Sequence, residues 1–118
     1  MRRLTCPLIL LVSASLGAAG PPEPTEGDYV VRDFKFDSGE VLPELRIHYR
    51  TLGTPRRDVG GVVRNAVLIL HGTTGSGANF FRPEFAGELF GKGQPLDADR
   101  YFLILPDGIG HEIGRAHV

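Results

Sequence analysis

The sequence predicts an α/β fold built on a mixed β-sheet, in which an antiparallel hairpin is followed by a parallel β-α-β unit. Two short apolar runs, at residues 67–70 and 101–105, stop at turn residues, a pattern typical of strands buried on both faces. A helical pattern beginning at Pro83 lies between them, and strands joined by a helical crossover run parallel. Upstream, apolar and polar residues alternate between Tyr29 and Tyr49, which predicts two half-exposed strands.

The first twenty residues have the pattern of a secretory signal peptide. Arg2 and Arg3 precede the apolar run Leu8–Val12, and the small residues between Ala14 and Gly20 supply cleavage positions. The apolar run is shorter than the roughly twenty residues that a membrane-spanning helix needs. We therefore expect residues 1–20 to direct export to the periplasm or the extracellular space, without a stable membrane anchor.

Cysteine content and charge narrow the possible function classes. The single cysteine, Cys6, lies in the predicted signal segment, so the exported chain would depend on its hydrophobic core rather than on a disulfide. The 13 basic and 14 acidic side chains give a net charge of −1. The densest basic cluster, Arg56-Arg57, has the composition of a solvated loop, so we expect no nucleic-acid partner.

A linker and a hairpin are predicted to follow the signal segment. Residues 21–28 are rich in proline and polar residues and are predicted to be the linker, and residues 29–111 are predicted to be one domain. Its first strand begins at Tyr29, and its second runs from Leu45 to Tyr49. His48 falls on the polar face of the second strand, which predicts a surface side chain.

The parallel unit follows a loop at residues 54–64. Pro83 is a favoured first helical residue, and apolar residues follow it at helical spacing until the glycines of residues 91–93 end the helix. The second buried strand, at residues 101–105, ends at Pro106-Asp107-Gly108. The helix is therefore the crossover between the two buried strands.

The loop after the first buried strand carries three glycines, Gly72, Gly75 and Gly77, which give it access to positive φ and leave its N–H groups uncovered. Such a loop can bind an oxyanion. A Walker loop is excluded because Ala78-Asn79 follow Gly77 where Lys-Ser/Thr is required, and a dinucleotide fingerprint is excluded because Phe80 replaces its third small residue. An ordinary turn after a buried strand is the alternative interpretation.

Three segments together resemble the N-terminal part of a homoserine O-acetyltransferase-like member of the α/β-hydrolase superfamily. They are SGEVLPELRIHYRTLGT at residues 38–54, NAVLILHGTTGSG at residues 65–77 and GKGQPLDADRYFLI at residues 91–104. The resemblance implies the N-terminal part of an α/β-hydrolase fold, incomplete in this chain. Where transferases of the family usually carry His-Ala-Leu-Thr-Gly, this chain has His71-Gly72-Thr73-Thr74-Gly75, which is more similar to the loop of esterases.

The resemblance also implies roles for residues of this loop. The backbone N–H of Thr73 matches the family's oxyanion donor, and Gly72 lets the chain turn toward the acyl oxygen. His71 and Gly75 match structural positions that brace the loop, and His71 is not expected to be the catalytic base.

No catalytic residue is expected within the chain itself. None of the four serines lies in a Gly-x-Ser-x-Gly elbow, so the resemblance places the serine, the carboxylate and the histidine beyond residue 111. The four histidines share no metal-ligand spacing, and we expect neither a metal nor a cofactor. The expected function is an exported serine hydrolase of small-molecule acyl esters, inactive in this fragment, with an acyl-CoA-dependent O-acyltransferase or a non-catalytic pseudoenzyme as alternatives.

The last seven residues, EIGRAHV at 112–118, match neither the family nor an apolar period. They can be translated from a common sequencing-adapter read. We therefore expect residues 112–118 to be a non-native tail.

Overall fold

The computed structural model describes residues 23–109. The predicted signal peptide at 1–20, the first two linker residues, His111 and the predicted tail at 112–118 lie outside the described residues. Within the described part of the chain, no helix has the length and apolar character needed to cross a bilayer.

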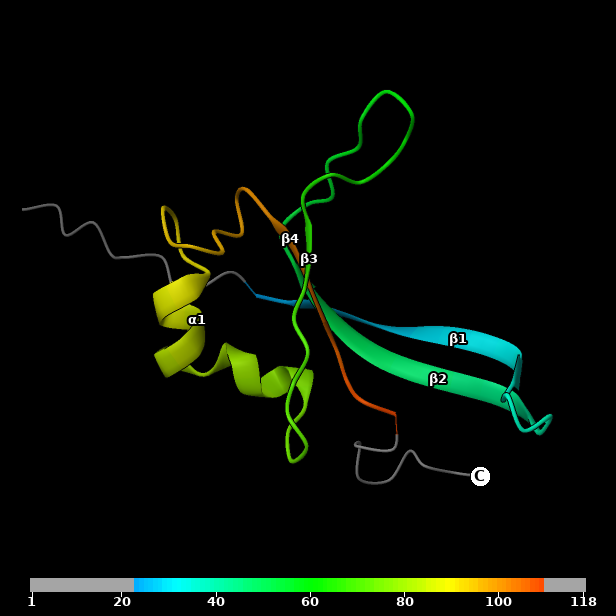
Figure 1. Cartoon of the computed structure of the whole chain (residues 1–118). Coiled ribbons are helices and arrows are strands. Elements are labelled where there is room, and N and C mark those ends of the chain that lie inside the picture. Colours follow the sequence, from blue (N-terminus) through cyan, green and yellow to red (C-terminus); the bar gives the residue numbers. More distant parts are fainter. Residues whose placement is uncertain (1–22, 110–118) are drawn as a thin grey trace, which may run out of the picture.

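A four-stranded mixed sheet organises the fold (Figure 1). Its strands are β1 (Thr25–Lys35), β2 (Val41–Leu52), β3 (Ala66–Leu68) and β4 (Phe102–Pro106), in the spatial order β1-β2-β4-β3. β2 pairs antiparallel with both β1 and β4, whereas β3 and β4 are parallel. The predicted antiparallel hairpin and parallel β-α-β unit are therefore confirmed, and the fold is a partial α/β fold.

The hairpin is longer than the sequence pattern predicts. β1 begins at Thr25, so residues 25–28, which were assigned to the linker, are paired in the sheet. Cross-strand side-chain pairs explain this extension: Glu26 lies opposite Arg50 and forms an ion pair with it, and Asp28 lies opposite His48 and hydrogen-bonds to its ring. Opposite charges on directly facing residues stabilise an antiparallel pair. The proline and acidic content of residues 21–28 therefore predicts the start of β1 four residues too late, at Tyr29 instead of Thr25.

β3 differs from its prediction as a strand buried on both faces. It spans only Ala66–Leu68, and Leu68 and Leu70 are 60% and 68% exposed. Val67 and Ile69 point the other way and pack against the core. Within residues 23–109, the crossover helix covers one face of the sheet, and the opposite face of β3 has no helix against it (Figure 1). The side chains of this continuous apolar run therefore point alternately toward the core and toward the uncovered face of the sheet.

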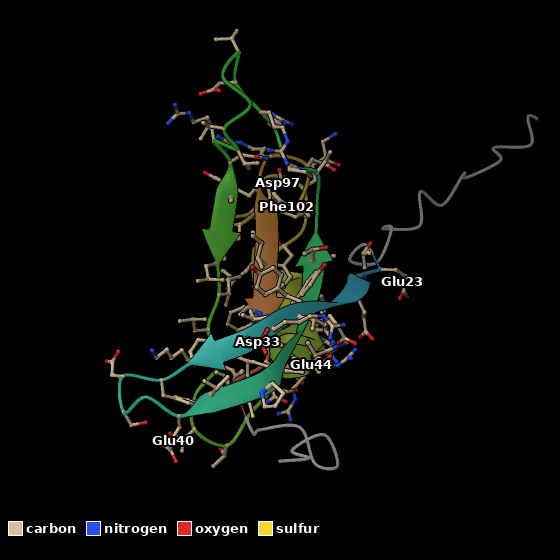
Figure 2. The ribbon with its side chains drawn as sticks, turned by 90° about the vertical axis from the view of Figure 1, so that its right-hand side faces the viewer. Glu23, Asp33, Glu40, Glu44, Asp97 and Phe102 are labelled. Atoms are coloured by element: carbon tan, nitrogen blue, oxygen red, sulfur yellow. The ribbon has the colours of Figure 1, made fainter. Side chains whose placement is uncertain are left out.

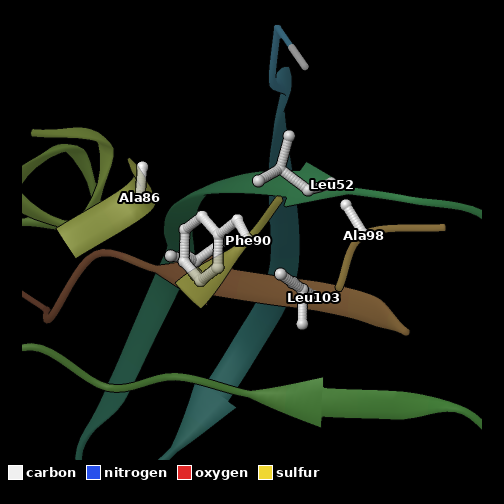
Figure 3. Close-up of a cluster of buried hydrophobic side chains, with 6 residues drawn as sticks. Leu52, Ala86, Phe90, Ala98 and Leu103 are labelled. Carbon is white, nitrogen blue, oxygen red and sulfur yellow. The ribbon is translucent and has the colours of Figure 1, made fainter. Parts of the chain in front are cut away.

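The crossover carries a 3₁₀ helix, η1 (Gly77–Phe81), followed by α1 (Pro83–Leu89), with proline at the helix start as predicted. Helix α1 packs on the sheet around Phe90 and Leu103, which are 1% and 0% exposed (Figure 3). The buried apolar cluster comprises Leu52, Ala86, Phe90, Ala98, Leu103 and Leu105.

The loop that returns the chain to the sheet is held by Asp97, in the segment leading to Phe102 on β4 (Figure 2). Its carboxylate accepts hydrogen bonds from the N–H groups of Gly93 (2.7 Å) and Asp99 (2.8 Å). The Gly93 bond is the main reason that the pKa of Asp97 is lowered. This carboxylate fixes the entry into β4.

Candidate active site

A hollow of about 400 Å³ lies at the carboxyl ends of the parallel strands β3 and β4. Ligands of open α/β sheets bind at the carboxyl ends of the strands. The hollow is formed by the loops that follow the two strands, and its lining residues are Leu70, His71, Gly72, Thr73, Pro106, Asp107 and Gly108.

A four-residue turn presents the amide of Thr73 at this hollow. The Gly75 N–H donates a hydrogen bond to the Gly72 carbonyl oxygen at 3.2 Å, which closes the turn with Thr73 and Thr74 at its two central positions. Closing such a turn does not use the N–H of its second residue. Within residues 23–109, the Thr73 N–H donates no hydrogen bond to a backbone or side-chain acceptor, and Thr73 is exposed. The Thr73 N–H is therefore a backbone donor that is available to a ligand at this site.

His71 joins the two loops that form the hollow. Its Nε2 atom accepts a hydrogen bond from the Gly108 N–H at 2.6 Å, and its Nδ1 atom lies 2.7 Å from the Gly72 carbonyl oxygen. A carbonyl oxygen only accepts and an N–H only donates, so this pair of contacts requires the neutral ring with its proton on Nδ1. Both ring nitrogens are thus occupied in holding the loops together.

Asp107 is a buried residue of the site that sequence reasoning treated only as part of a strand exit. Its side chain is 4% exposed, and its Oδ1 atom accepts a hydrogen bond from the Gly77 N–H at 2.6 Å. Both carboxylate oxygens lie 3.3 Å from Nη1 of Arg50 on β2. An acidic residue directly after a buried strand, together with an arginine on a neighbouring strand, was the available sequence signal.

Close contacts rather than positive φ explain two of the three loop glycines, Gly75 and Gly77. None of the three is among the residues with positive φ, contrary to the expectation from the sequence. A Cβ on Gly77 would lie 2.6 Å from the Leu105 carbonyl oxygen, and one on Gly75 would lie 2.6 Å from Nδ2 of Asn79. A Cβ on Gly72 would meet nothing within 4 Å. Gly77 therefore permits close packing against β4, and Gly72 leaves the hollow open.

His48 differs from its prediction as a surface side chain. Its side chain is only 12% exposed, with Nδ1 2.8 Å from the Asp28 carboxylate and Nε2 3.7 Å from that of Glu26. The extended β1 strand supplies both carboxylates, which explains the difference. His48 does not line the hollow, although its backbone carbonyl oxygen accepts a hydrogen bond from the Asp107 N–H.

The two described serines are both placed outside any nucleophile elbow. The Ser76 hydroxyl caps η1 by accepting a hydrogen bond from the Ala78 N–H, and Ser38 contacts Glu40 in the hairpin turn. Among residues 23–109, no three histidine, cysteine or acidic side chains gather as a metal site. What the described site offers chemically is a rigid backbone donor at an open hollow.

Comparison with known sequences identifies relatives of the chain. It is 37% identical over 86 residues to the homoserine O-acetyltransferase of Leifsonia xyli, an alignment that covers 65% of this chain and 20% of the relative. The chain is similar in sequence to the N-terminal part of homoserine O-acetyltransferases, in agreement with the resemblance seen in its three segments. It spans about one fifth of the length of the curated relatives it matches. No protein-family model matches the chain.

Solved structures confirm the α/β-hydrolase fold. An acetylester hydrolase from Corynebacterium glutamicum superimposes with a TM-score of 0.59 at 24% identity, covering 74% of this chain and 22% of the hydrolase. The homoserine O-acetyltransferase of Bacillus anthracis gives a TM-score of 0.55 at 23% identity, covering 71% and 23% of the two chains. The described residues are thus the N-terminal part of the α/β-hydrolase fold, as the sequence predicts.

Proposed function

We propose that this chain is the N-terminal part of an exported serine hydrolase that cleaves small-molecule acyl esters. In this proposal the Thr73 amide is one of two donors that bind the developing oxyanion, and Gly72 leaves room for the acyl group. The observation that carries the proposal is the turn closed between Gly72 and Gly75, which leaves the Thr73 N–H available at the hollow.

The proposed role follows from the electrostatics of acyl transfer. Negative charge develops on the acyl oxygen in the transition state, and a pre-oriented N–H stabilises it without a cost of reorganisation at that moment. One such donor changes kcat by about 10²- to 10³-fold. The bonds of His71 hold the turn in place before any substrate binds.

The serine, the carboxylate and the catalytic histidine are proposed to lie in the longer protein, beyond residue 111. The fragment itself would bind an acyl group without attacking it, since it supplies no nucleophile elbow. The full-length protein is the product of the complete gene that contains residues 1–111. The sequence EIGRAHV at 112–118 remains a proposed non-native tail, which resequencing of the gene tests.

Hydrolysis is favoured over transfer by two features of the sequence. The loop His71-Gly72-Thr73-Thr74-Gly75 is more similar to that of esterases than to that of the transferases, and the signal-like residues 1–20 point to export. Acyl-CoA is a cytoplasmic metabolite, whereas water is the acceptor available outside the cytoplasm. The similarity to the Leifsonia xyli protein favours the second candidate, an O-acyltransferase.

Assays on the full-length protein separate these functions. We expect hydrolysis of p-nitrophenyl acetate, and no consumption of acetyl-CoA in the presence of homoserine. Acetyl transfer to homoserine would instead assign the protein to the O-acyltransferases. A gene that encodes no Gly-x-Ser-x-Gly elbow after residue 111 would make the protein a pseudoenzyme and would refute both enzymatic functions.

A further inference from the structure

A buried ion pair beside the hollow has no part in the function proposed above. The side chains of Arg50 and Asp107 are 13% and 4% exposed, and their charged groups lie 3.3 Å apart. A buried ion pair is costly to form unless further hydrogen bonds satisfy both charges. Here Nε of Arg50 donates to Glu26 at 2.7 Å, and Asp107 accepts from the Gly77 N–H at 2.6 Å.

These contacts form one continuous connection across the sheet. It starts at Glu26 on β1, passes through Arg50 on β2 and Asp107 after β4, and ends at Gly77 in the loop after β3. Glu26 belongs to the segment that the sequence pattern assigned to a linker. The antiparallel hairpin is therefore bonded to the loop that carries the proposed oxyanion donor.

The loop is fixed to the end of β4 at both of its ends. At its start, Nε2 of His71 accepts from the Gly108 N–H, and at its end the Gly77 N–H donates to Asp107. Between these points the Gly72–Gly75 turn is closed by its own hydrogen bond. The direction of the Thr73 N–H thus depends on two anchors, one of which is the Asp107 carboxylate.

Arg50 also offsets the charge of Asp107. Asp107 is one of the residues that line the hollow in which the acyl oxygen would become negative. Without a counter-charge, the negative Asp107 carboxylate would disfavour the negative charge that develops on the acyl oxygen, because like charges in a partly buried site repel strongly. The guanidinium group, 3.3 Å from both carboxylate oxygens, removes this opposition.

We infer that Asp107, held and partly neutralised by Arg50, whose guanidinium group Glu26 orients, is a positioning residue that sets the Thr73 amide for oxyanion binding. The inference rests on the function proposed above. Its test uses full-length variants in two measurements: steady-state ester hydrolysis, and hydrogen exchange of the backbone amides of residues 72–78, which needs no activity.

We expect Asp107→Ala to lower kcat by about 100-fold, the scale for losing one oxyanion donor, with KM changed by less than about threefold. The affinity of the Asp107→Ala variant for a boronic acid that mimics the tetrahedral intermediate should fall by the same factor as kcat. Asp107→Asn keeps an oxygen that can accept from the Gly77 N–H, so its kcat should fall less. The Gly77 amide should exchange faster in the alanine variant than in the asparagine variant.

Matched controls use the second arginine on the same face of β2. Arg46 contacts Glu44 at 2.7 Å, the same distance as between Arg50 and Glu26, but it does not contact the loop. Arg50→Lys should lower kcat by about tenfold relative to Arg46→Lys, because lysine lacks the planar fork that reaches two carboxylates. This comparison decides the inference if Asp107→Ala does not fold.

The outcomes separate the inference from the proposed function. A folded Asp107→Ala variant with wild-type kcat and wild-type amide exchange would overturn the inference while leaving the hydrolase intact. Equal kcat values and equal amide-exchange rates in Arg50→Lys and Arg46→Lys would likewise overturn the inference. A wild-type protein that hydrolyses no ester would refute the proposed function, and amide exchange alone would then decide whether Asp107 orders the loop.

Discussion

The carboxylate of Asp107 accepts a hydrogen bond from the backbone N–H of Gly77 at 2.6 Å, and this contact joins the end of β4 to the loop that follows β3. The two residues are 30 positions apart in the sequence. The contact is possible because Gly77 has no side chain and its backbone approaches the Leu105 carbonyl oxygen. The loop geometry thus depends on one acidic side chain and one glycine.

Replacing Gly77 with alanine should destabilise the full-length protein by about 1–3 kcal/mol, the usual cost of overpacking. The new Cβ would lie 2.6 Å from a backbone oxygen that cannot move without shifting β4. Urea unfolding measures the change. Gly87→Ala in α1 is the control: its Cβ would meet nothing within 4 Å, and it should stabilise the protein by about 0.5–1 kcal/mol. Equal effects at both positions would contradict the close approach of Gly77 to β4.

His71→Ala should lower kcat for ester hydrolysis by about tenfold or more, because it removes the anchor between the Gly72 carbonyl oxygen and the Gly108 N–H. The pH dependence of the remaining activity should keep the wild-type shape, since the ring acts as a brace and not as the general base. A residual activity that no longer rises with pH along the acidic limb of the wild-type profile would instead make His71 the general base.

Stability should fall at acid pH partly through Asp97. Hydrogen bonds from the N–H groups of Gly93 and Asp99 lower its pKa. Its contribution is therefore complete above the unfolded pKa of about 3.9 and is lost as the pH falls through the lower folded value. Urea midpoints between pH 7 and pH 2 should drop less for Asp97→Asn than for wild type. Asp99→Asn, which leaves the acceptor for Gly93 in place, should follow the wild-type curve.

The 118-residue chain alone should be insoluble or molten. Leu68 and Leu70 are mostly exposed, and within residues 23–109 β3 pairs on one side only, with β4. An apolar edge strand of this kind promotes association between chains. Thermal unfolding followed by near-UV circular dichroism should show no sharp transition. A cooperative transition of the purified chain would contradict the prediction.

Local patterns predicted the architecture well, because the sheet topology follows from them. Two apolar runs around a helix specified the parallel β3–β4 pair, and Pro83 marked the start of α1. The predicted strand boundaries were less accurate where pairs of residues far apart in the sequence determine them. β1 begins at Thr25 because its acidic residues lie opposite Arg50 and His48. The local composition of residues 21–28 does not reveal this pairing.

The site was predictable only in its local part. One short segment predicted the glycine loop at residues 72–77 and the position of His71 after an apolar strand. The contacts of Asp107 with Arg50 and Gly77 join residues 57 and 30 positions apart, so no single segment carries their signal. The glycine pattern predicts positive φ, whereas none of the three loop glycines has it, and Gly75 and Gly77 instead lie where a Cβ would clash.

The most direct test of the account is a crystal structure of the full-length protein inactivated with an alkyl phosphonate ester, which leaves a tetrahedral, negatively charged adduct on the catalytic serine. We predict that one phosphonyl oxygen lies about 2.7–3.1 Å from the backbone nitrogen of Thr73, the range of oxyanion-hole contacts. A phosphonyl oxygen bound only by other donors, with the Thr73 N–H directed away from it, would contradict the central claim.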